Sequence, residues 1–168
     1  DSTGVRQSLV ALGFSSLTAV VAGGLLAAMT GTLERYPGLL VLVPAAIGMR
    51  GNIFGALGSR LATSIHAGTF RISRRPETLV MQNVIASGVL SLVTAVALAV
   101  LTKTLSPIFG LDSVVAISDL LVLSAVGALL SFLVLTAVTL AMAARSAQRG
   151  WDLDDVNAPL VSAVGDVV

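Results

Sequence analysis

Asp166 has the most unusual setting of any charged residue in this sequence. It follows the apolar run Pro159-Leu160-Val161-Ser162-Ala163-Val164-Gly165, which places its carboxylate one to two turns into an otherwise uncharged helix. A carboxylate at bilayer depth is costly, so it rarely faces lipid and usually marks an ion path, a proton relay or a counter-ion. In a membrane-spanning chain, Asp166 is therefore the first candidate for a cation ligand.

The composition is typical of a membrane-spanning chain. Hydrophobic residues make up 55% of the 168 residues and charged residues 11%, whereas soluble domains contain about 25% charged residues. Mean hydropathy is +0.96. The sequence has no cysteine and no basic run interleaved with aromatic residues, which argues against disulfides, thiolate chemistry and nucleic-acid binding.

Five apolar stretches are candidates for membrane spans, because about 20 residues cross the hydrocarbon core as a helix. We therefore expect an all-α membrane protein, a five-transmembrane-helix bundle forming a single domain over residues 1–168. The last stretch is too short to cross, so we expect the natural chain to continue; a re-entrant half-helix is the alternative. The stretches are 7–30, 38–65, 78–101, 114–144 and 155–168.

The basic residues of the connections predict the orientation, since short cytoplasmic loops carry an excess of Lys and Arg. The connections after the second and fourth stretches are arginine-rich, whereas the other two are mixed in charge. We therefore expect a cytoplasmic N-terminus and an outside C-terminus. The arginines are Arg71, Arg74 and Arg75 after the second stretch, and Arg145 and Arg149 after the fourth.

The second stretch combines a glycine face with a polar stripe. The glycines recur at 3-4-3 spacing, which places them on one side of a helix and permits close contact with another helix. Pro44 favours a kink or an unwound turn, whose freed carbonyls would need protein or a water-filled cavity. Two interpretations stay open: a packing helix and a pore-lining helix. The glycines are Gly48, Gly51, Gly55 and Gly58, and the stripe is Asn52, Ala56, Ser59 and Thr63.

Further polar residues lie within the apolar stretches. Arg50 is deep in the second stretch and needs a partner, for which a salt bridge to an acidic residue of another helix is the simplest account. Arg60 can extend to the cytoplasmic interface. A third-stretch face of Asn83, Ser87 and Ser91 favours hydrogen bonds between helices.

Two more carboxylates lie near helix ends. Asp119 belongs to an outer vestibule or faces water near the headgroups. Asp155, in the acidic segment 152–155, either caps the last helix, with Pro159 in its first turn, or attracts cations at the inner mouth. We find no nucleophile with a His/Asp partnership, no phosphate loop and no HExxH motif, so we do not expect an enzyme.

Two segments resemble the solute carrier family 41 magnesium transporters, which are relatives of the bacterial MgtE magnesium channels. The run from Gly51-Asn52 to Ser59-Arg60-Leu61-Ala62-Thr63 resembles that family's Gly-Asn…Ser-Arg-Leu-Ser-Thr segment. The acidic segment 152–155, followed by Pro159-Leu160 and Gly165-Asp166, is similar to its final-helix motif. The resemblance covers essentially the whole chain.

The resemblance implies a five-helix MgtE-type unit that transports divalent cations, Mg²⁺ first, across a prokaryotic cytoplasmic membrane. Because the chain holds one such unit, it implies a homodimer with a pore at the two-fold axis. Asp166 of each copy would be the central cation-binding carboxylate, Asn52 would lie in the pore-lining motif, and the Ser162 region would supply backbone oxygen.

The chemistry of Mg²⁺ agrees with this implication. Mg²⁺ is hard, octahedral and slow to dehydrate, so its sites use one or two carboxylates and keep several waters. Two copies of Asp166 would balance its charge. The absence of thiols and of clustered histidines argues against zinc or copper but is compatible with Mn²⁺ or Co²⁺.

Two alternatives use the same residues. The chain could be a non-transporting membrane subunit whose glycine face binds another protein. It could also be a proton-coupled transporter of small solutes, since a lone buried Asp can carry a proton.

Overall fold

The structure, a computed structural model, describes residues 2–73, 75–111, 115–149, 160–161, 163–165 and 167. Within these ranges the chain is helical and contains no strand, which confirms the all-α class. The elements are α1 (Ser2–Ala28), α2 (Thr30–Arg35), α3 (Gly38–His66), α4 (Leu79–Leu105), the short 3-10 helix η1 (Ser106–Phe109) and α5 (Ile117–Arg149).

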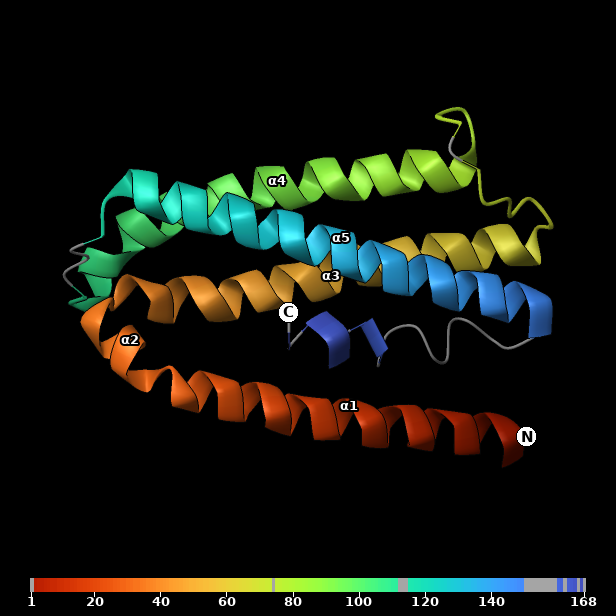
Figure 1. Ribbon diagram of the computed structural model, residues 1–168, viewed down its shortest axis with the longest axis horizontal. Helices are drawn as coiled ribbons and strands as arrows, with labels where there is room; N and C mark the ends of the chain where they lie inside the picture. The colour runs from red at the N-terminus through yellow and green to blue at the C-terminus, as the bar shows by residue number, and fades with distance from the viewer. Residues whose placement is uncertain are drawn as a thin grey trace.

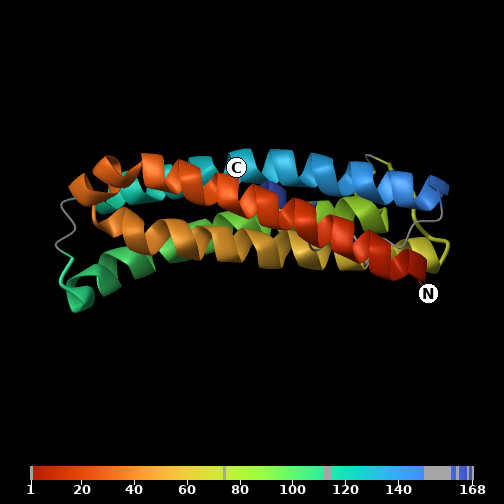
Figure 2. The same cartoon turned by 90° about the horizontal axis from the view of Figure 1, so that it is seen from below.

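The helices α3, α4 and α5 form an antiparallel bundle, with α4 packed against both of the others. The short helix α2 joins α1 to α3, and α1 runs back along the outside of the bundle, farthest from α4 (Figures 1 and 2). The described helical residues of the last segment, 160–161 and 163–165, lie beside α3 and α5 about halfway along the bundle (Figure 1).

Three of the described helices are long and apolar enough to cross a membrane: Gly38–His66, Leu79–Phe109 and Ile117–Gln148. They occupy the ranges where the second, third and fourth spans were predicted. Within α1, the stretch Ser15–Ala28 forms a shorter apolar helix. The count of five spans and the orientation of the termini stay predictions.

The helix α3 continues without interruption through Pro44 and the glycines. The predicted unwound turn is therefore wrong. Pro44 removes only one backbone donor, early in the helix. Unwinding would free several more backbone groups, and hydrocarbon supplies no hydrogen-bond partner for them.

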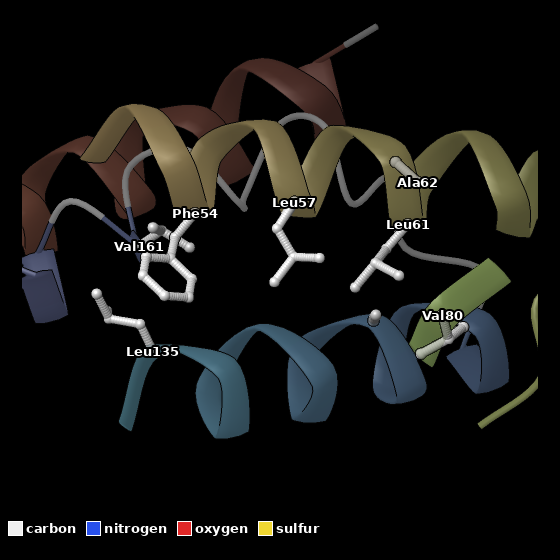
Figure 3. Close-up of a cluster of buried hydrophobic side chains, with 8 residues drawn as sticks. Phe54, Leu57, Leu61, Ala62, Val80, Leu135 and Val161 are labelled. Carbon is white, nitrogen blue, oxygen red and sulfur yellow. The ribbon is translucent and has the colours of Figure 1, made fainter. Parts of the chain in front are cut away.

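The core lies between α3 and α5, where apolar side chains of both helices point toward one another (Figure 3). Phe54 is the largest of them, with 1% of its surface exposed. Its ring lies 6.4 Å from that of Phe132, centroid to centroid, in a tilted arrangement. Val80 of α4 and Val161 of the last segment complete the cluster, so three spans and the final motif share one packed centre. The cluster also contains Leu57, Leu61, Ala62, Leu135 and Ala143.

Small residues bring α4 close to α5. A Cβ on Gly88 would lie 3.1 Å from the ring of Phe132, so only glycine leaves room for this ring without a shift. Ser87 and Ser91 are buried, as the polar face predicted. Their hydroxyls donate to the carbonyls of Asn83 and Ser87 in the same helix, at 2.9 and 2.8 Å. The expectation of bonds between helices is therefore wrong for the two serines.

Asn83 does bridge two helices. Its Oδ1 accepts a hydrogen bond of 3.2 Å from Nη1 of Arg60 on α3, and its Nδ2 donates to the carbonyl of Leu79. Arg60 is exposed, consistent with the predicted extension toward an interface.

Truncation of Phe54 tests whether the α3–α5 contact holds the bundle together. Phe54→Ala should lower the free energy of unfolding by about 2 kcal/mol, because the cavity penalty of about 24 cal/mol per Å³ acts on a void of roughly 100 Å³. Leu92→Ala is the control, because Leu92 is 48% exposed on α4, and it should change the value by less than about 0.5 kcal/mol. Denaturation in mixed detergent measures both. Equal losses in the two variants would contradict the packing described.

Candidate functional site

The structure places five of the predicted pore-lining residues on one side of α3. Gly48, Asn52, Ser59 and Thr63 are exposed in the single chain, and Gly55 is half-buried between them. We call Gly48, Asn52, Gly55, Ser59 and Thr63 the α3 stripe. A Cβ on Gly48 or Gly55 would meet nothing within 4 Å. Gly51, also predicted, is half-buried and lies to the side of the stripe.

The α3 stripe faces away from the packed centre. Phe54, Leu57 and Leu61 occupy the opposite side of the helix and are buried against α5 and the last segment. Around Gly48 and Gly55 a Cβ would meet nothing within 4 Å. Gly58, the fourth glycine of the predicted face, is buried, so the interpretation of the glycine face as a packing surface stays open.

The polar side chains of the α3 stripe differ in whether they have a hydrogen-bond partner among the described residues. The hydroxyl of Thr63 donates to the carbonyl of Ser59 at 3.0 Å. The amide of Asn52 makes no side-chain hydrogen bond with any described residue. An amide within a membrane span needs water, an ion or another protein surface as its partner.

The final motif is described in part. Asp166, Ser162, Pro159 and Asp155 lie outside the described residues. Val161, Ala163 and Gly165, the described residues next to Ser162 and Asp166, are buried. A Cβ on Gly165 would lie 3.8 Å from Cδ1 of Leu135, so this segment runs closely past α5.

A cavity of about 900 Å³ lies between α1 and the bundle. Its lining is mainly apolar and comes from all five α-helices and from Val167, which follows Asp166 in the sequence. A small set of polar groups also lines it, namely Arg50, Thr32, Thr94, Ser91, Ser124 and Ser131.

Arg50 is the charged residue of this cavity. It points toward α5, where its Nη2 would lie 3.3 Å from a Cβ on Gly127. Among the described residues none forms a hydrogen bond or an ion pair with it. The expected salt bridge to another helix is therefore not seen within the described part of the chain.

Asp119 lies apart from the α3 stripe. It is exposed in the first turn of α5, where a carboxylate is favoured by the helix dipole. Its Oδ1 accepts a hydrogen bond of 3.4 Å from Ser118. The structure therefore does not bring Asp119 together with the predicted site residues of α3.

The described residues contain no group of three or more His, Cys, Asp or Glu side chains that could hold a metal ion. A cation site built from them would use neutral oxygen groups, as Mg²⁺ accepts in its hydrated form.

Sequence reasoning missed the α5 side of the cavity. Ser124, Gly127, Ala128 and Ser131 recur at 3-1-3 spacing in the fourth stretch, and this run of small residues was the available signal.

The comparison with protein families agrees with the membrane-spanning helices of the structure. A family profile described as "MgtE: Divalent cation transporter" matches residues 43–168, which include the α3 stripe, Arg50 and the final motif. The comparisons with curated proteins and with solved structures gave no match. The match covers three quarters of the chain, and three of its helices are able to cross a membrane. The protein is an integral membrane protein that belongs to the MgtE family of divalent cation transporters.

Proposed function

We propose that this protein moves Mg²⁺ across a membrane through a pore at the two-fold axis of a homodimer, with Asp166 of each copy as the cation-binding carboxylate. The observation that carries the proposal is the α3 stripe, an outward-facing polar and glycine surface on a helix long and apolar enough to span a bilayer. Mn²⁺ and Co²⁺ are further substrates that the same oxygen ligands accept.

The α3 stripe fits a pore better than it fits lipid. In hydrocarbon the amide of Asn52 would find no water to hydrogen-bond with, which is unfavourable. Against a second copy, the glycines allow the two α3 helices to approach closely. The amide of Asn52 and the hydroxyl of Ser59 then face a shared aqueous path along the two-fold axis.

The final motif supplies the charge of the proposed site. The residues that precede Asp166, namely Val161, Ala163 and Gly165, are buried against α3 and α5, as a rigid support for a ligand requires. The backbone oxygen of Ser162 is the second ligand we assign to this segment. Pro159 begins it, and Asp155 before it attracts cations to the inner mouth.

The proposed chemistry follows from the hydration of Mg²⁺. The ion loses its waters reluctantly, so the site binds it with most of its water shell in place. The two Asp166 carboxylates balance its double charge, while the neutral oxygens of Asn52 and Ser162 accept hydrogen bonds from its waters. This arrangement holds the ion without the full dehydration that would trap it.

The ends of the bundle support the proposed orientation in a prokaryotic cytoplasmic membrane. The α3–α4 connection, the end of α5 and the start of α1 lie at the same end (Figure 1). Exposed arginines gather there, namely Arg71, Arg75 and Arg145. By the bias of short loops toward Lys and Arg, this end faces the cytoplasm.

Replacement of Asp166 tests the site. Asp166→Asn removes the charge at nearly constant volume, so it should weaken Mg²⁺ binding at least a hundredfold while the dimer still assembles, since both carboxylates of the proposed site are lost. Isothermal titration in detergent, with Ca²⁺ and Mn²⁺ as competitors, measures the affinity. Asp119→Asn is the control and should bind as the wild type does. If Asp166→Asn and the wild type bind equally, the assignment of Asp166 is wrong.

Filling a gap in the α3 stripe tests the interface. A Cβ on Gly55 would meet nothing within 4 Å, so Gly55→Leu should leave the monomer folded and lower the dimer association constant at least tenfold. Ala97→Leu, at an exposed position of α4, is the control and should leave association unchanged. Light scattering during size-exclusion chromatography gives the mass of each species. A stable Gly55→Leu dimer, or a wild-type monomer, would contradict the two-fold pore.

A further inference from the structure

The cavity between α1 and the bundle is lined by no residue of the α3 stripe, so it is distinct from the proposed cation path. Of the named helices, α1 packs closely only against α2, and the cavity separates it from α3, α4 and α5 (Figures 1 and 2). The α1 wall consists of side chains that are exposed in the single chain, among them Leu25 and Met29. A cavity of this size, mainly apolar with a few polar groups, is typical of a site for a small molecule.

Arg50 gives this cavity a positive charge at membrane depth. It is twelve residues from Gly38, the start of α3, which corresponds to about 18 Å along the helix. Its Nη2 would lie 3.3 Å from a Cβ on Gly127, so the guanidinium lies against α5. The other polar side chains that line the cavity carry hydroxyls, and no described carboxylate is among them. Such a lining suits an anion and repels a cation.

The cavity hydroxyls add one unused hydrogen-bond donor to this charge. The hydroxyls of Ser91, Thr94 and Ser131 donate to carbonyls of their own helices, at 2.8, 2.7 and 2.7 Å. The hydroxyl of Ser124 is buried and has no hydrogen-bond partner among the described residues. Ser124 and Gly127 are three residues apart and therefore share a side of α5. Rotation of the Ser124 side chain to another staggered position gives this hydroxyl an acceptor in a ligand bound beside the guanidinium.

We propose that this cavity binds a long-chain carboxylate, with its acyl chain along the apolar wall and its carboxylate on Arg50 and Ser124. A guanidinium binds a carboxylate through two parallel hydrogen bonds. The headgroup of a phospholipid stays at the membrane surface, whereas Arg50 lies about 18 Å along α3, so a single-chain acid fits better. Without the ligand, water in the cavity solvates the guanidinium, as it does for other charged groups that face a cavity within a membrane.

The test measures the binding of a spin-labelled fatty acid to the protein in proteoliposomes, at a pH where the acid is ionised and without divalent cations. The immobilised fraction of the probe gives its affinity, and the methyl ester of the same acid is the neutral reference. The wild type should bind the acid roughly tenfold more tightly than the ester, because hydrogen bonds between charged groups are stronger. Arg50→Gln should remove this preference and leave ester binding unchanged. Arg60→Gln, at an exposed arginine of the same helix, is the control and should bind both probes as the wild type does.

A second pair of variants locates the probe. Gly23 lines the cavity and Gly24 does not, and a Cβ on either would meet nothing within 4 Å. Gly23→Phe should weaken the binding of acid and ester alike by roughly tenfold, because its ring occupies part of the cavity. Gly24→Phe is the matched control and should leave both unchanged. This pair keeps Arg50, so it tests the site even if Arg50→Gln does not fold.

Three outcomes would overturn the proposal. Equal binding of acid and ester to the wild type would mean that water alone solvates Arg50. Equal effects of the two α1 variants would place the probe on the outer surface of the protein. Loss of the dimer in Gly23→Phe, with probe binding unchanged, would assign the cavity to a second copy of the chain. None of these outcomes bears on the cation site, because the assay contains no divalent cation.

Discussion

Hydrocarbon offers no partner to a polar group, and this constraint governs the structure. Backbone groups satisfy this constraint by hydrogen-bonding within long helices, and α3 therefore stays helical through Pro44. Side-chain hydroxyls on α4 meet it by bonding to carbonyls of their own helix. Groups that cannot be matched within the chain then mark the places where water, an ion or a second chain must act.

The helix α3 shows how one element serves several purposes. Its side with Phe54, Leu57 and Leu61 binds it to α5 and to the last segment. A different side carries the α3 stripe, of which Gly48, Asn52, Ser59 and Thr63 are exposed and Gly55 is half-buried. Arg50 points to the cavity next to α5. The packed side fixes the helix, and this allows the other two sides to carry groups that are unfavourable in lipid.

Much of the fold could be predicted from long apolar runs, because only helices bury their backbone groups in hydrocarbon. The outward direction of the α3 stripe could not be predicted. Helical spacing shows that Gly48 and Asn52 share a side, but it does not show whether that side or the Phe54 side meets the bundle. Packing decides this, since the Phe54 ring fits against Phe132 and the glycines would leave voids there. Helical spacing likewise could not predict that the side chain of Arg50 lies close to Gly127.

The most direct test of the account is the access of water to the α3 stripe. The chain has no cysteine, so single variants Ser59→Cys and Ile85→Cys can be compared in proteoliposomes with a charged, membrane-impermeant thiol reagent. Both positions are exposed in the single chain and lie about two turns from the α3–α4 connection. The account predicts rapid labelling of Ser59→Cys, slowed by Mg²⁺, and little labelling of Ile85→Cys, which faces lipid. Equal labelling at the two positions would contradict an aqueous path along α3.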